Sequence, residues 1–226
     1  CMDHRITALK AQKRNPNRIN VYLDGNFAFG LARIVAAWLQ IGQTINDEKI
    51  QTLQSQDTSE VAYQKALHFL SYRPRSETEI RRKLNEDGFS GEISETVLGR
   101  LREAGLVSDR TFARNWVESR SASKPRGRHA LTAELHRKGI SDEIIQDTLV
   151  GTDDESDLAY RAGLRYANRF SQADWDTFRT RLTAFLGRRG FSYGTITPQV
   201  KKIWNEIHGD QSENQTLNEE ELDNYG

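Results

Sequence analysis

Cysteine, proline and long apolar runs are scarce in this chain of 226 residues, and each scarcity excludes a class of protein. The single cysteine, Cys1, has no partner for an intrachain disulfide, so we expect a reducing, cytoplasmic setting. Four prolines favour helices over an all-β design. The longest apolar stretch, at residues 34–39, is too short to cross a bilayer, and no signal-peptide pattern opens the chain. These absences predict a soluble protein that makes no membrane contact.

An excess of charge of either sign is also absent. Lys plus Arg and Asp plus Glu number 32 each, so bulk attraction to nucleic acid is weak and any such contact must come from local patches. With 36% apolar and 28% charged residues, several thin units are favoured over one deep core. Acidic residues gather after Gly209, where Lys and Arg are missing, so residues 209–226 are expected to form an acidic, disordered tail.

Apolar and polar residues alternate between Ile6 and Leu31, as they do in a β-strand. Two turn signals interrupt the alternation, at residues 15–17 (Asn-Pro-Asn) and 24–26 (Asp-Gly-Asn), and Asp-Gly is typical of a hairpin. The sequence therefore predicts an N-terminal region, residues 1–56, that holds a small antiparallel β-hairpin or sheet with short helices.

From about Asp57 the apolar period changes to that of a helix, and the pattern then repeats at an offset of 51 residues. Five adjacent columns align in three copies: Ile80, Leu131 and Leu182; Leu84, Leu135 and Leu186; Gly88, Gly139 and Gly190; Phe89, Ile140 and Phe191; Ser90, Ser141 and Ser192. Apolar residues four apart line one face of a helix, and the glycine four residues later ends it. Apolar helical segments precede and follow this one, so each copy is expected to hold three helices.

The predicted fold class is mainly α, with three tandem three-helix repeats that stack into an elongated, curved array behind the N-terminal sheet. The repeats are expected at residues 57–107, 108–152 and 153–208. Pro198 follows Thr197, which is typical of a first helical turn and predicts where the last helix begins.

No residue pattern predicts catalysis. Glu77, Glu79 and Lys83 resemble the carboxylates and lysine of a metal-dependent nuclease, but Glu residues after Ser76 are better explained by helix capping and the helix dipole. No G-x-x-x-x-G-K phosphate loop occurs, so ATP hydrolysis is not expected. We expect neither an enzyme nor a cofactor.

Three further groups are interpreted as structural. His129 and His136 lack a Cys or a third His to complete a zinc shell. The acidic run Asp153, Asp154, Glu155 and Asp157 is interpreted as a helix start and not as a cation site. The four tryptophans are expected in the core and not as platforms for stacked bases; they are Trp38, Trp116, Trp175 and Trp204.

Basic patches are the remaining candidates for function. They recur at equivalent positions of the repeats, so stacking would line them along one surface suited to a phosphate backbone or an acidic protein groove. Arginine also offers planar, bidentate contacts to phosphate or carboxylate. The candidates are Arg73, Arg75, Arg81, Arg82 and Lys83 in the first repeat, Arg120, Lys124, Arg126 and Arg128 in the second, and Arg188 and Arg189 in the third.

The repeats resemble the RecX family of regulatory proteins. In the first repeat the residues that carry the resemblance are Ala62, Tyr63, Ala66, Leu67, Leu70, Arg73, Arg75, Ser76, Glu77, Ile80, Leu84, Gly88 and Phe89. The second repeat continues it with Leu98, Leu101, Gly105, Asp109, Phe112, Ala113, Trp116, Arg120, Pro125, Arg126, Gly127, Leu131, Glu134, Leu135, Lys138, Gly139 and Ile140. Residues 59–150 match directly, and 154–208 match by repeat register.

The resemblance implies a cytoplasmic regulator of the RecA recombinase. RecX proteins lodge in the groove of the RecA–DNA filament, restrain its ATPase and strand exchange, and favour disassembly, and some also contact DNA. We therefore expect the RecA filament as partner, single- or double-stranded DNA as a further one through the basic patches, and a monomer in solution. The alternative is a stand-alone DNA-binding protein, because three-helix units resemble helix-turn-helix domains.

Overall fold

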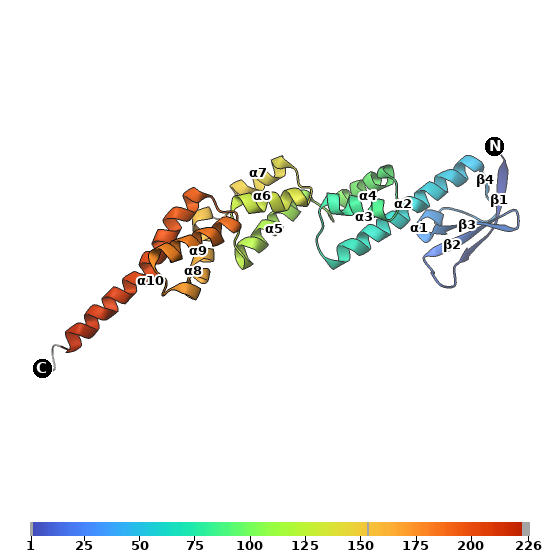
Figure 1. Ribbon diagram of the computed structural model, residues 1–226. Coiled ribbons are helices and arrows are strands. Elements are labelled where there is room, and N and C mark those ends of the chain that lie inside the picture. The colour runs from blue at the N-terminus through green and yellow to red at the C-terminus, as the bar shows by residue number, and fades with distance from the viewer. Residues whose placement is uncertain (1, 153, 223–226) are drawn as a thin grey trace. The chain divides into compact units, whose positions relative to one another are not determined.

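The computed structural model describes residues 2–152 and 154–222, with side chains as far as Gly209. The chain divides into two compact units, Cys1–Ser108 and Asp109–Gly226. An antiparallel sheet opens the first unit, and helices form the rest of both units (Figure 1). The predicted class, mainly α with an N-terminal sheet, is confirmed.

The sheet has four strands in the order β3-β2-β1-β4. These are β1 (Asp3–Ala11), β2 (Arg18–Leu23), β3 (Asn26–Ala32) and β4 (Thr44–Asn46), with the short helix α1 (Arg33–Ala36) between the last two. Asp24 and Gly25, between β2 and β3, have φ of 51° and 85°. Two consecutive positive φ values are typical of the hairpin turn that Asp-Gly predicted.

Helix α2 (Asp47–Tyr72) belongs to both cores of the first unit. Its first half packs Leu53 into the core beneath the sheet, and its second half packs Ala62 and Ala66 into the first helical core. Asp57, between these halves, forms an ion pair with Arg18 of β2 at 2.8 Å. One continuous helix therefore crosses the boundary expected between residues 56 and 57.

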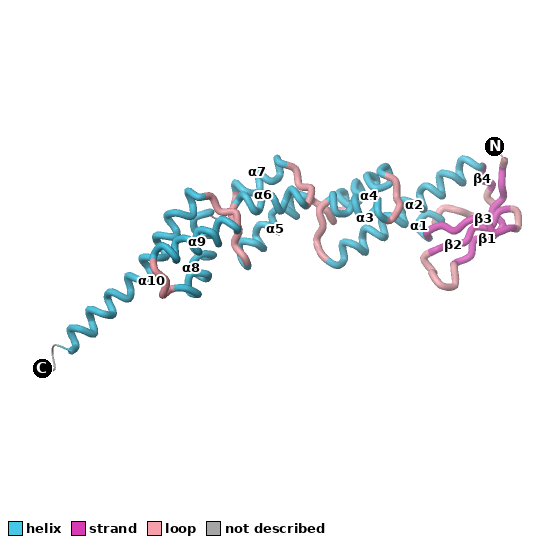
Figure 2. Tube along the Cα trace, viewed as in Figure 1, coloured by secondary structure: helices cyan, strands magenta, loops and turns pink. Residues whose placement is uncertain are grey.

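Three consecutive three-helix units follow (Figure 2). The first consists of the end of α2 with α3 (Glu77–Glu86) and α4 (Gly91–Glu103). The second consists of α5 (Asp109–Ser123), α6 (Arg128–Arg137) and α7 (Asp142–Val150). The third consists of α8 (Glu155–Ala167), a 3-10 turn at Asn168–Phe170, α9 (Trp175–Arg188) and α10 (Tyr193–Leu222). Each unit has its own buried core.

The repeat columns correspond to one turn motif that occurs three times. Gly88, Gly139 and Gly190 have φ of 88°, 78° and 82°. The next residue of each copy donates its N–H to the carbonyl oxygen five residues back: Phe89 to Leu84, Ile140 to Leu135 and Phe191 to Leu186, at 3.1, 3.1 and 3.3 Å. These left-handed glycines and back-bonds end the middle helix of every unit, so the predicted repeat is confirmed.

Two expectations about single residues are wrong. Trp38 is 88% exposed, because the neighbouring Ala36 and Leu39 occupy the buried positions beside this four-residue helix; the other three tryptophans pack against the helical cores. Pro198 lies inside α10, which begins at Tyr193, since the Ser192 hydroxyl accepts from the amide of Thr195 and provides the start.

The segment expected as an acidic tail overlaps the last helix. Helix α10 continues to Leu222, into the segment expected to be disordered from Gly209. Its residues include good helix formers such as Glu, Gln and Leu, and no glycine or proline interrupts it between Asp210 and Leu222. Residues 223–226 lie outside the described part of the chain.

Candidate functional site

The first predicted basic patch is largely engaged in pairs within its own unit. Arg73 donates to Glu79 at 2.9 Å, Arg81 pairs with Glu95, and Lys83 pairs with Asp87 at 2.7 Å. Hydrogen bonding by the carboxylates raises the pKa of Arg81 and of Lys83. Such pairs satisfy the cations internally and leave less of their charge for a partner.

Arg75 and Arg82 belong to the same patch, but the structure gives neither of them a carboxylate partner among the described residues. The guanidinium of Arg75 lies 3.9 Å from the ring centroid of Phe69, and its Nε is buried without a hydrogen-bond partner. Burial, followed by the charge of Arg73, lowers the pKa of Arg75. Arg82 is exposed, and the structure gives its side chain no ion pair.

The three residues that resemble a nuclease set, Glu77, Glu79 and Lys83, are engaged in helix capping and in ion pairs within the first helical unit. Ser76 and Glu79 form a capping box at the start of α3, in which the Ser76 hydroxyl accepts from the Glu79 amide at 3.2 Å. Glu77 accepts two hydrogen bonds from Arg102, at 2.9 and 2.6 Å. Among the side chains that the structure describes, in residues 2–152 and 154–209, no three His, Cys, Asp or Glu lie close enough to hold a metal ion. The capping interpretation is therefore the better account.

Arg120 and Arg126 of the second patch converge on one buried carboxylate. Glu134 of α6 is 7% exposed and accepts from Trp116 at 2.8 Å, Arg120 at 2.9 Å and Arg126 at 2.9 Å. Burial acts to raise the pKa of Glu134, but the hydrogen bonds from Arg120 and Trp116 outweigh it and hold the pKa below its ordinary value. These two arginines therefore act mainly as internal partners of Glu134.

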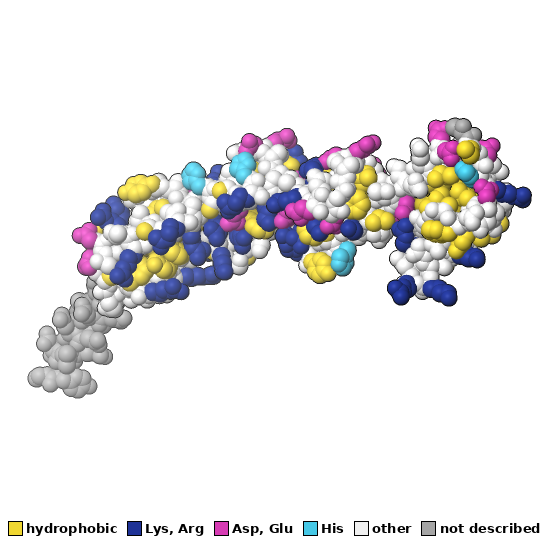
Figure 3. Space-filling view, turned by 45° about the vertical axis from the view of Figure 1, so that its right-hand side comes forward, with side chains coloured by type: hydrophobic (Ala, Val, Ile, Leu, Met, Phe, Trp, Pro, Cys, Tyr) yellow, Lys and Arg dark blue, Asp and Glu magenta, His cyan; other side chains and the backbone are white. Residues whose placement is uncertain are grey.

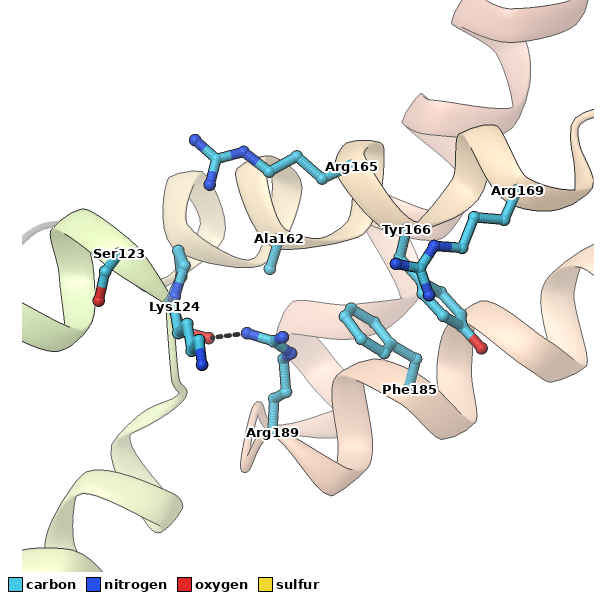
Figure 4. Close-up of a pocket in the computed structure, with 9 residues that line it drawn as sticks. Ser123, Lys124, Ala162, Arg165, Tyr166, Arg169, Phe185 and Arg189 are labelled. Carbon is cyan, nitrogen blue, oxygen red and sulfur yellow. Dashed lines mark hydrogen bonds between the residues drawn. The ribbon is translucent and has the colours of Figure 1, made fainter.

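Lys124 and Arg189 lie in a pocket of about 250 Å³ within the C-terminal unit, between the end of α5, α8 and α9 (Figure 4). Arg165 of α8 and Arg169 of the 3-10 turn that follows α8 also line the pocket, and no acidic residue of the described chain does. We call it the basic pocket. Tyr166 and Phe185 stack there, with ring centroids 3.9 Å apart. It brings together two predicted residues from different repeats with two arginines that were not predicted from the sequence.

A sequence signal for these two arginines was available. Arg161, Arg165 and Arg169 follow one another at intervals of four, a spacing that predicts one side of a helix. Arg161 and Arg165 lie in α8, and Arg169 lies in the 3-10 turn that follows it. Lys and Arg side chains gather over the helices of the C-terminal unit in Figure 3. Of the remaining predicted residues, Arg128 and Arg188 are exposed, and the structure gives their side chains no ion pair.

A larger groove of about 1,080 Å³ lies in the N-terminal unit, between the sheet region and α2. Ile34 and Tyr72, at 64% and 70% exposure, are among the residues that line it. Trp38 lies beside Ile34 in an adjoining hollow. We call the groove and this adjoining hollow together the apolar groove. It was not predicted from the sequence, because Trp38 was expected in the core.

Helices that could cross a membrane are absent from the described residues.

Comparison with known proteins gives three domain matches. Residues 4–46 match the regulatory protein RecX N-terminal domain, 62–101 the RecX first three-helix domain, and 108–149 the RecX second three-helix domain.

Full-length relatives agree with these domain matches. The chain is 30% identical to regulatory protein RecX of Clostridium perfringens over 89% of this chain and 97% of the relative. It is 28% identical to regulatory protein RecX of Bacillus subtilis over 88% and 76%. A crystal structure of regulatory protein RecX superposes with a TM-score of 0.72 at 28% identity, covering 85% of this chain and 96% of that one. RecX from Lactobacillus salivarius, at 24% identity and a TM-score of 0.59, shares the fold over 65% of this chain and 97% of that one.

Proposed function

Because the chain belongs to the RecX family of regulatory proteins, we propose that it binds the RecA nucleoprotein filament and restrains its ATPase, strand exchange and coprotease activities in recombination and the DNA-damage response. The observation that carries this proposal is the run of matched domains along residues 4–149, together with the repeated three-helix geometry. The regulator would act as a cytoplasmic monomer, without a cofactor and without catalysis of its own.

The apolar groove supports a protein partner. Exposed Trp, Tyr and Ile side chains are costly in water, and clusters of them are typical of protein-binding surfaces. Trp38, Tyr72 and Ile34 provide such a cluster in the N-terminal unit. Tryptophan and tyrosine also dominate the binding energy of protein interfaces.

The cations without a carboxylate partner support contact with an acidic surface. The paired arginines would need to break an internal ion pair before they bound anything else, whereas Arg82, Arg128 and Arg188 are exposed and the structure gives them no pair. We therefore narrow the predicted patches to these three residues and to those of the basic pocket. Complementary charges of this kind affect the rate and specificity of association more than affinity.

Co-sedimentation with RecA assembled on single-stranded DNA, compared with the same DNA without RecA, tests the proposal. Enrichment in the RecA–DNA pellet and a dose-dependent fall in RecA ATPase are expected. Equal pelleting with and without RecA, combined with unchanged ATPase, would contradict it.

A further inference from the structure

We propose that the apolar groove binds an acidic amphipathic helix of a partner protein. The inference deepens the proposed function: it rests on that proposal for the class of partner, a protein, and adds the conformation and the charge of the segment that is bound. All residues that line the groove belong to the N-terminal unit, so the site is complete within that unit.

The size of the groove and the exposure of its apolar side chains point to a segment of a chain as the occupant. Its larger part, of about 1,080 Å³, exceeds the roughly 300–1,000 Å³ typical of pockets for small molecules. Ile34, Tyr72 and Trp38 are each at least 64% exposed along it. An occupant that covers all three must reach from the groove into the adjoining hollow, which favours a chain segment over a metabolite.

One wall of the groove is a stripe of side chains along α2. Val61, Lys65, His68 and Tyr72 line it at helical spacing, so they share one side of the helix. The stripe is roughly 17 Å long at about 1.5 Å per residue, the length of a helix of about twelve residues. The other wall comes from the sheet region, including the end of β3 and the start of α1. Two such walls form the kind of groove into which a helix inserts its apolar face.

An extended segment is disfavoured, because the sheet edge beside the groove is already closed. Strand β3 is an edge strand. At its end, the amide of Ala32 donates to Asp57 at 2.6 Å, and the carbonyl oxygen of Gly30 accepts from Arg18 at 3.0 Å. A strand added there would displace both side chains, which also pair with each other at 2.8 Å. A helix forms its backbone hydrogen bonds internally, so side-chain contacts are enough to hold it.

Charge at the groove favours an acidic occupant. Five Lys or Arg side chains line it against two carboxylates, and both carboxylates are engaged. Glu60 is 7% exposed and pairs with Arg100 at 2.9 Å. Asp87 pairs with Lys65 at 3.3 Å and with Lys83 at 2.7 Å. One carboxylate shared by two lysines leaves positive charge for the carboxylates of an incoming helix.

Arg33 and Ile34 combine positive charge and apolar surface at adjacent positions of α1. Arg33 is exposed, and the structure gives it no ion pair among the described residues. Ile34 is 64% exposed, so the groove variant, Arg33→Gln with Ile34→Ala, should keep the fold. The matched control is Arg5→Gln with Ile41→Ala. Arg5 is exposed, Ile41 is 66% exposed, and both lie in the N-terminal unit outside the lining of the groove.

Fluorescence anisotropy of a labelled synthetic peptide, measured with the full chain in the absence of RecA, tests the groove. The probe is a peptide of about twelve residues with leucine along one helical face and glutamate along the other. A second peptide has lysine in place of glutamate. A third has the composition of the probe in an order that distributes leucine over all faces. Circular dichroism and melting temperature verify that both protein variants are folded.

We expect the unmodified chain to bind the probe more tightly than the other two peptides, and the groove variant to bind it roughly tenfold more weakly, with little change in the control variant. Rising salt should weaken binding, because part of the attraction is between charges. Absence of probe binding, equal binding of the lysine peptide or of the reordered peptide, or equal weakening by both variants would overturn the proposal.

Sedimentation velocity of the unmodified chain provides a further check. A dimer that forms with rising concentration and that the groove variant abolishes would assign the groove to a second copy of the chain and reject the helix. RecA co-sedimentation is scored separately. Filament binding without probe binding would reject the helix alone, and probe binding without filament binding would reject RecA as the partner and leave the groove assigned.

Discussion

Gly127 and Gly190 lie in direct backbone contact at the junction of the second and third helical units. A Cβ atom on Gly127 would overlap the carbonyl oxygen of Gly190, and the amide of Gly127 donates to the carbonyl oxygen of Arg189 at 2.9 Å. Gly190 also ends α9 with φ of 82°. One glycine of the repeat pattern therefore has a second role, in docking two units.

Gly127→Ala should loosen this junction. Gly127 has φ of −75°, which alanine adopts freely, so the expected loss of about 1–3 kcal/mol comes from the steric overlap alone. Urea unfolding measures this loss of unfolding free energy. Gly151→Ala is the control, since φ there is −89° and nothing lies within 4 Å of its Cβ position; it should be neutral or slightly stabilising. Equal effects of the two changes would argue against docking through Gly127.

Gly88→Ala should cost about 1 kcal/mol for a different reason. Its Cβ would meet nothing within 4 Å, but φ is 88°, so the strain lies in the backbone. Gly99→Ala, in the interior of α4 with equally open surroundings, should instead stabilise by roughly 0.5–1 kcal/mol. Thermal unfolding of the pair separates backbone strain from packing, and stabilisation by both would refute the role of Gly88.

Glu134→Gln should destabilise the C-terminal unit by about 1–3 kcal/mol, because two arginines and Trp116 lose a charged acceptor. Glu143→Gln is the control, because Glu143 pairs with Arg110 at 2.9 Å but its side chain is 77% exposed. This variant should lose no more than about 0.5 kcal/mol of unfolding free energy. Chemical denaturation compares the unfolding free energies of the two variants.

The same geometry implies that Arg126→Glu, which sets a second carboxylate against Glu134, destabilises the fold. Arg128→Glu is therefore the cleaner probe of partner binding.

The Glu134 contribution also has a pH signature. Its pKa is lowered in the folded chain, so the ionised carboxylate stabilises fully above its ordinary value of 4.5, and the stabilisation is lost as pH falls through the folded pKa. The difference in unfolding free energy between the unmodified chain and Glu134→Gln should therefore shrink on acidification below about 4.5. A difference independent of pH would contradict the ion-pair account.

His4 should titrate above its ordinary pKa of 6.5. Hydrogen bonds to Asp24 first and to Asp47 second raise the pKa, with ring nitrogens 3.0 and 3.2 Å from the carboxylates. Because the folded pKa is raised, this stabilisation is fully present below pH 6.5 and is lost as pH rises through the folded value. An NMR titration of the imidazole measures the midpoint, which Asp24→Asn should lower. A midpoint at or below 6.5 would exclude the bridge.

Trp38→Ala should weaken co-sedimentation with the RecA filament about tenfold or more, since an exposed tryptophan is a frequent interface anchor. The melting temperature should hardly change, because the side chain is 88% exposed. Tyr193→Ala, which removes a 74% exposed aromatic side chain from the C-terminal unit, provides the comparison and should bind normally. Normal binding by the Trp38 variant would exclude the apolar groove as the contact.

The sequence by itself determined the elements and their repetition. The turn at Asp24 and Gly25, and the helix ends at Gly88 and Gly139, depend on local backbone preference and on apolar spacing, both of which can be read from neighbouring residues. The sequence also placed α3 correctly after Ser76, because a capping box is a local pattern.

Only the tertiary structure decided which cations are free to act. Arg120 and Arg126 looked available in the sequence, yet both pair with Glu134 of α6. Lys124 instead lines a pocket together with Arg165 and Arg169, and no carboxylate of the described residues lines it. The exposure of Trp38 was decided in the same way. The physical reason is that Coulomb interaction and burial depend on distance in space, and residues far apart in the chain come close only when the helices pack.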